Sequence, residues 1–155
     1  MPWGSGAKHA NRLSISPIVG VRAGSHRCFD RFVIDLRSQP AAGWTVRYHA
    51  VTHPGTGAPL PVRGGASLEV IIGAAAYDSA GSPTFRPRNR MELVDVTGFD
   101  VFRQVAFAGS FEGDSTFGMG VRSRLPFRVF AVQDGPQGKL VVDVARGWLS
   151  QRAPR

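Results

Sequence analysis

Apolar and polar residues alternate along most of the chain. Between residues 31 and 37, the apolar side chains of Phe32, Ile34 and Leu36 alternate with charged ones such as Asp35. A period of two is typical of a β-strand with one buried and one solvated face. Similar runs give about eight to ten expected strands. They lie near residues 15–23, 31–37, 44–49, 68–72, 103–111, 116–122, 127–133 and 139–144. The pattern shows no amphipathic helix and allows at most a short helical turn near residues 88–94 or Trp148.

Turn residues separate these runs and favour antiparallel pairing. Ala23–His26 and Asp134–Gly138 are expected hairpin tips, since each combines glycine with polar residues. Amphipathic antiparallel sheets bury their apolar faces against each other, so we predict an all-β fold: a two-sheet antiparallel β-sandwich with little or no helix. A closed barrel is the alternative. An apolar–apolar–Asp–apolar pattern at 33–36 recurs at 141–144 and hints at two related half-sheets, because aspartate is uncommon inside strands.

Length and charge distribution indicate one domain with basic tails. A chain of 155 residues suits a single domain. We expect a basic flexible tail over residues 1–12, one β-sandwich domain over 13–146 and a basic tail over 147–155. The net charge of +8 is concentrated towards the two ends, which hold no acidic residue before residue 13 or after residue 145. Binding to a nucleic-acid duplex needs a basic face on the folded body, so nucleic acid is not an expected partner.

Six short motifs in a fixed order resemble the AMIN-like domain of actinobacterial cell-envelope proteins and lipoproteins. They read FDRFVID from Phe29, WTVRY from Trp44, RGGASLEV from Arg63, GSFEG from Gly109 with FGMG from Phe117, PFRVF from Pro126 and LVVDV from Leu140. The resemblance covers residues 18–145 or so. It implies a β-sandwich without catalytic residues that contacts peptidoglycan or other envelope glycans.

The same resemblance implies an extracytoplasmic location. This sequence itself shows neither a signal peptide nor a lipobox cysteine, because Cys28 follows Ser25, His26 and Arg27 instead of a small apolar run. Cys28 is also the one cysteine of the chain, so it forms no intramolecular disulfide.

Several patterns suggest chemistry but fit structural roles better. The glycines in Gly109–Gly120 lack the Gly-Lys-Ser/Thr of a phosphate-binding loop. His49 and His53 have a spacing that suits a metal on a helix, but they lie on an expected strand and the loop after it. Glu112 and Asp114 lie at one turn and cannot face each other across a glycosidase cleft. We therefore expect no enzyme, no cofactor and no metal site.

Two groups of residues remain as candidate sites. The first group lies within the motifs and suits either structural ion pairs or hydrogen bonds to glycan hydroxyls. Its members are Asp30, Arg31, Arg103, Glu112 and Arg128. The second group lies on the long loop between residues 77 and 90, where aromatic rings next to arginines suit stacking on sugars or binding to anionic polymers. Its members are Tyr77, Phe85, Arg86, Arg88 and Arg90.

The sequence thus predicts a non-catalytic, cell-envelope-associated binding domain that recognises peptidoglycan or another cell-wall glycan. The alternative is a protein–protein interaction module that acts through an exposed strand or the 77–90 loop. The expected partners are a cell-wall glycan or an envelope protein, without nucleic acid and without a membrane-spanning segment. No pattern indicates the oligomeric state.

Overall fold

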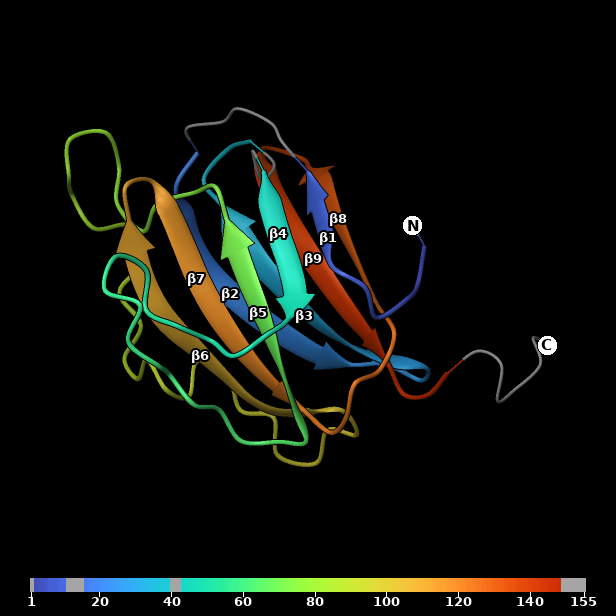
Figure 1. Cartoon of the computed structure of the whole chain (residues 1–155). Coiled ribbons are helices and arrows are strands. Elements are labelled where there is room, and N and C mark those ends of the chain that lie inside the picture. Colours follow the sequence, from blue (N-terminus) through green and yellow to red (C-terminus); the bar gives the residue numbers. More distant parts are fainter. Residues whose placement is uncertain (1, 11–15, 40–42, 149–155) are drawn as a thin grey trace.

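The computed structural model describes residues 2–10, 16–39 and 43–148. In these ranges it contains nine strands and no helix, and hence no helix that could span a membrane (Figure 1). The strands form two separate antiparallel sheets, which confirms the predicted β-sandwich over the closed barrel. They are β1 (Lys8–Ala10), β2 (Ile18–Ser25), β3 (Phe29–Leu36), β4 (Trp44–Tyr48), β5 (Ala66–Ile72), β6 (Phe102–Phe111), β7 (Asp114–Val121), β8 (Phe127–Asp134) and β9 (Gln137–Ala145).

The larger sheet has the order β1-β4-β5-β7-β6 and the smaller sheet the order β2-β3-β9-β8. Tight turns join β2 to β3, β6 to β7 and β8 to β9. The β8–β9 turn is at Gly135–Pro136, within the expected tip, whereas β2 runs to Ser25 and places its turn at residues 26–28. At the β6–β7 turn, Glu112 and Gly113 have φ angles of 51° and 88°, as a two-residue turn between right-twisted strands requires.

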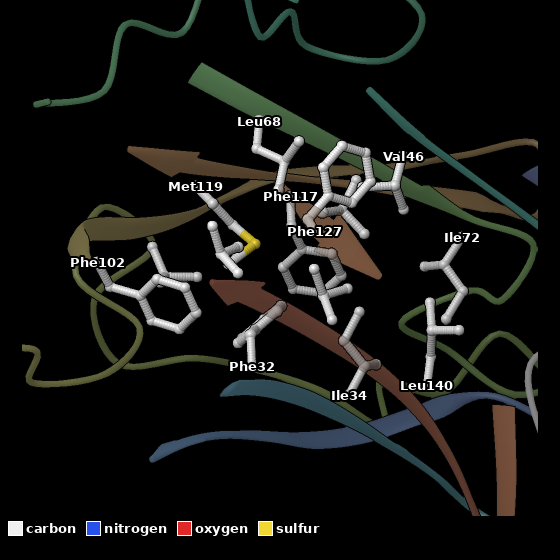
Figure 2. Packing of buried hydrophobic residues seen from close by; sticks show 14 of the residues in the cluster. Phe32, Ile34, Val46, Leu68, Ile72, Phe102, Phe117, Met119, Phe127 and Leu140 are labelled. Carbon is white, nitrogen blue, oxygen red and sulfur yellow. The ribbon is translucent and has the colours of Figure 1, made fainter. Parts of the chain in front are cut away.

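Inward-facing side chains of both sheets form one core (Figure 2). The ring of Phe32 in β3 lies 5.7 Å from that of Phe117 in β7, centroid to centroid, so an aromatic contact joins the two sheets. Other buried members of the core include Ile34, Leu36, Val46, Leu68, Ile72, Phe102, Met119, Phe127 and Leu140. Each large apolar side chain removed from water contributes about 1.5–3 kcal/mol. The alternation in the sequence therefore supplies the main attraction between the sheets.

Tyr48 adds a polar connection between the sheets. Its hydroxyl in β4 donates a hydrogen bond to the carbonyl oxygen of Leu125 at 2.6 Å and accepts one from the Leu125 N–H at 2.9 Å. Leu125 lies just before β8 of the smaller sheet. Burial raises the pKa of Tyr48 to about 12, so the phenol stays neutral over the ordinary pH range.

Within the segment expected as a tail, residues 1–12, the structure describes residues 2–10, and these contact both sheets. Lys8–Ala10 pair with Trp44–Val46 at the edge of the larger sheet. Gly4 forms an isolated bridge with Phe127 of the smaller sheet. A three-residue strand is too short to show an alternation, which is why no periodicity marked it. The expected C-terminal tail lies mostly outside the described residues.

Candidate functional site

The predicted binding loop begins with a small hairpin of its own. Tyr77 and Pro83 form an isolated antiparallel bridge. The Asp78 carboxylate oxygen Oδ1 accepts hydrogen bonds from the N–H groups of Ala80 and Ser82, both at 3.0 Å. An aspartate that bonds the backbone two to four residues ahead is a common way to fix a turn. These contacts fix the shape of the loop from Tyr77 to Pro83.

A hollow of about 450 Å³ lies between this loop and β6. The rings of Tyr77, Phe85 and Phe107 contribute to its wall, and Tyr77 remains 39% exposed. The Arg90 guanidinium lies over the Phe107 ring, with its central carbon 4.9 Å from the centroid. Arg90 has no carboxylate partner among the described residues, and none of the side chains that line the hollow is acidic. The hollow therefore suits a ligand that combines a ring with negative or hydrogen-bond-accepting groups.

His53 forms part of the opposite wall of this hollow. Its Nδ1 lies 2.9 Å from the Ala108 carbonyl oxygen, and because a carbonyl can only accept, Nδ1 carries the hydrogen. Nε2 is then left for another partner. His49 lies elsewhere, with its Nδ1 at 2.7 Å from the Ala50 carbonyl oxygen. Within the described ranges, no group of three or more histidine, cysteine or acidic side chains could hold a metal ion.

A second hollow, of about 540 Å³, lies between residues 85–93 and the beginning of β2. Arg86 and Arg88 contribute to its lining; both are exposed, and neither has an ion-pair partner in the part of the chain that the structure describes. Glu92 also lines this hollow, but Arg63 binds its carboxylate at 2.6 Å. This hydrogen bond holds the pKa of Glu92 below its ordinary value. The arginines of the loop thus keep their charge uncompensated.

The structure places Phe85 at the border of the core. Its ring makes an edge contact with Phe107 at 5.2 Å and lies 6.2 Å from Phe117. It is partly buried and contributes to the lining of both hollows. Replacing Phe85 would therefore disturb core packing as well as any ligand site.

The polar residues of the motifs do not form a single network. Arg31 and Arg128 do come together, because both bind Asp143 of β9. Arg31 reaches Oδ1 through Nε at 2.7 Å and Oδ2 through Nη2 at 2.9 Å, and the Nε of Arg128 reaches Oδ2 at 2.9 Å. Asp143 is fully buried, whereas the two arginine side chains keep 30% and 24% of their exposure. Two positive charges thus share one carboxylate on the outward face of the smaller sheet.

Three aromatic rings surround these two arginines. The ring of Trp3 lies 4.4 Å from the central guanidinium carbon of Arg128. Phe29 lies 5.2 Å from the corresponding carbons of Arg31 and Arg128, and Phe130 lies 5.6 and 5.7 Å from them. These distances are within the range of cation–π attraction. The rings, the arginines and the buried carboxylate thus form one connected cluster on the outward face of the smaller sheet.

The candidate residues chosen from the sequence left out the other members of this cluster. Phe29, Phe130 and Asp143 lie within the family-like motifs, and Asp143 also belongs to the repeated apolar–apolar–Asp–apolar pattern, whose two copies lie on the paired strands β3 and β9. Trp3 belonged to the expected tail, and no pattern connected it with the domain. His53 was considered only as a metal ligand, although its place in the long loop after β4 was a signal for a binding role.

Asp30 has a role separate from the arginine pair. Its fully buried carboxylate accepts hydrogen bonds at Oδ2 from the backbone N–H groups of Val101 and Phe102, at 2.7 and 3.0 Å. The Ser25 hydroxyl donates to Oδ1 at 3.1 Å. Asp30 therefore connects β3 of the smaller sheet to the start of β6 in the larger sheet.

The remaining two candidates lie apart from these groups. Arg103 donates from Nη1 to the carbonyl oxygens of Phe99 and Asp100 at 3.2 and 3.1 Å, and so supports the turn before β6. A hollow of about 550 Å³ lies beside it. Glu112 is exposed at the β6–β7 turn, where its positive φ angle serves the tight reversal.

Comparison with known proteins identifies one domain family. A family model for the AMIN-like domain matches residues 16–146. The match includes all strands from β2 to β9 and leaves β1 outside. No curated protein and no solved structure matches the chain.

Proposed function

The chain belongs to the AMIN-like domain family, and on this basis we propose that it is a non-catalytic binding module of the cell envelope. Its ligand is peptidoglycan or another cell-wall glycan. Such a ligand lies outside the cytoplasmic membrane, so the module works there, in keeping with the resemblance of its motifs to envelope proteins and lipoproteins of actinobacteria.

The observation that supports this proposal best is the hollow beside the 77–90 loop. Its volume, about 450 Å³, falls in the range of small-ligand sites. The apolar face of a sugar ring can stack on Tyr77, whose side chain is partly exposed. Arg90 and the free Nε2 of His53 then face the hydroxyl, acetamido or carboxylate groups of the sugar.

The charge around the hollow extends the proposed contact surface. Arg86 and Arg88 lie on the neighbouring hollow, and like Arg90 they have no carboxylate partner among the described residues. A polymer that passes over the loop would meet three arginines. No carboxylate among the described residues competes with the polymer for their guanidinium groups. We assign direct ligand contacts to Tyr77, Arg86, Arg88 and Arg90, and the supporting wall to Phe85.

The test is cosedimentation of the full chain with purified cell-wall sacculi, comparing Arg90→Gln with Arg27→Gln. Arg27 is exposed in the β2–β3 turn and has no ion-pair partner in the described ranges. Both variants lower the net charge equally, so nonspecific attraction changes alike. We expect Arg90→Gln to weaken binding about tenfold and Arg27→Gln to leave it unchanged. Equal binding by both variants, with both folded by circular dichroism, would contradict the assignment of the site.

A second comparison identifies the polymer. Sacculi stripped of covalently attached anionic polymers should still bind the parent chain, and soluble fragments released by a muramidase should compete. Two results would refute the glycan ligand. In one, binding is lost when the anionic polymers are removed; in the other, salt abolishes binding and the soluble fragments do not compete.

A further inference from the structure

β8 forms one edge of the smaller sheet, and most of that edge has no backbone partner in the part of the chain that the structure describes. The N–H of Phe127 points away from β9 and donates to the Gly4 carbonyl oxygen at 2.8 Å. In β8, the backbone N–H and C=O groups of successive residues point alternately towards β9 and away from it. The N–H and C=O groups of Val129, Ala131 and Gln133 therefore also point away from β9.

Among the described residues, this edge is protected only at its ends, by Gly4 beside Phe127 and by the charged side chains of Arg128 and Asp134. The edge of β6 is covered, since Leu93 donates to the Val105 carbonyl oxygen at 2.9 Å and Phe107 donates to that of Arg90 at 2.7 Å. β8 pairs with β9 without a bulge from Phe127 to Asp134, and it contains neither lysine nor proline. Natural proteins use cover, bulges, lysine or proline to prevent unwanted strand pairing. Beyond Gly4, none of the described residues pairs with the outer edge of β8, so the stretch from Val129 to Gln133 can take another strand.

The sequence of β8 is complementary to itself in one antiparallel register. When Ala131 of one copy lies opposite Ala131 of another, Val129 lies opposite Gln133 and these residues exchange outward backbone hydrogen bonds. In the same register, Arg128 lies opposite Asp134 at both ends, so opposite charges meet twice, next to the Arg128–Asp143 and Lys139–Asp134 ion pairs within each copy. The pairing ends at corresponding positions on the two copies. Gly4 occupies the edge of one copy at Phe127, and the chain of the other copy turns away after Asp134, which is where the two would meet.

We propose that two copies of this chain associate through β8, antiparallel and centred on Ala131. The two smaller sheets then continue into one sheet across a two-fold axis, which is the usual symmetry of a homodimer. The inference is independent of the glycan proposal. β8 lies at the opposite edge of the smaller sheet from β2, where one of the two hollows of the loop opens.

Analytical ultracentrifugation over a concentration series tests the association, and backbone amide exchange followed by NMR tests the surface. We expect a monomer–dimer equilibrium. The amides of Val129, Ala131 and Gln133 should exchange more slowly as the dimer fraction rises, whereas that of Phe130, already bonded to β9, should be protected at every concentration. A chain that stays monomeric throughout, or a dimer in which those three amides exchange freely, would overturn the proposal.

Two variants locate the contact by different means. Ala131→Pro removes an outward N–H without removing a bond to β9, and should abolish the dimer. Asp134→Lys places like charges opposite Arg128 and should raise the dissociation constant about tenfold. Asp114→Lys makes the same charge change at the β6–β7 turn and should have no effect. If Ala131→Pro fails to fold, Asp134→Lys decides, and a dimer as tight as the parent's in that variant refutes the β8 contact.

Discussion

Replacing Asp30 with alanine removes a buried carboxylate that accepts hydrogen bonds from two backbone N–H groups of the other sheet. Both N–H groups, of Val101 and Phe102, are buried and would be left without an acceptor. Each unsatisfied group costs about 1–3 kcal/mol, so we expect a loss of about 3–5 kcal/mol in the free energy of unfolding. For a domain of this size, that loss lowers the melting temperature by roughly 10 °C.

Urea unfolding followed by tryptophan fluorescence measures this loss. Asp95→Ala is the matched control, because Asp95 is exposed and its carboxylate accepts local hydrogen bonds from Thr97, one of them from the backbone N–H at 3.0 Å. We expect its stability within about 0.5 kcal/mol of the parent. Asp30→Asn keeps an oxygen for the two N–H groups and should be milder than Asp30→Ala. If Asp30→Ala were no less stable than the Asp95→Ala control, the connection between the sheets would not be energetically significant.

Two further predictions follow from packing and ionisation. Tyr48→Phe loses two backbone hydrogen bonds and should lower stability by about 1–2 kcal/mol at pH 7. Because burial raises the pKa of Tyr48 to about 12 in the folded state, the unfolded phenol ionises first; the parent should lose stability from about pH 10 to 12, and Tyr48→Phe should lack that loss in urea titrations across this range. A Cβ at Gly120 would lie 1.7 Å from the Arg63 carbonyl oxygen, whereas one at Gly118 would meet only the Val51 side chain at 2.9 Å. Gly120→Ala should therefore cost about 3 kcal/mol or more and Gly118→Ala about 1–2 kcal/mol, and the reverse order in urea midpoints would contradict this packing.

The alternation of apolar and polar residues predicted eight of the nine strands, because it depends on which side chains face the core. It does not indicate which strands become neighbours. Arg31 and Arg128 share Asp143 only because β9 lies between β3 and β8, and strand order depends on contacts between residues far apart in sequence. The loop shows the same limit. Phe85, surrounded by prolines and arginines, had the sequence context of an exposed residue, yet it packs on Phe107 beneath β6.

The long connection between β5 and β6 is fastened to the sandwich at both ends. At its beginning, the Ser115 hydroxyl donates to the Ala74 carbonyl oxygen at 2.6 Å, and Ser110 accepts the Ala76 N–H at 3.1 Å. At its end, Asp30 holds the N–H of Val101. Between these junctions, Phe85 packs on the core and Leu93 donates to the Val105 carbonyl oxygen of β6, so only the exposed stretches, such as residues 79–82, can change in sequence and length while the two sheets stay as they are. Relatives that share these junctions could therefore differ in what they bind. A designed segment inserted between the two junctions would be anchored at both ends by the same contacts.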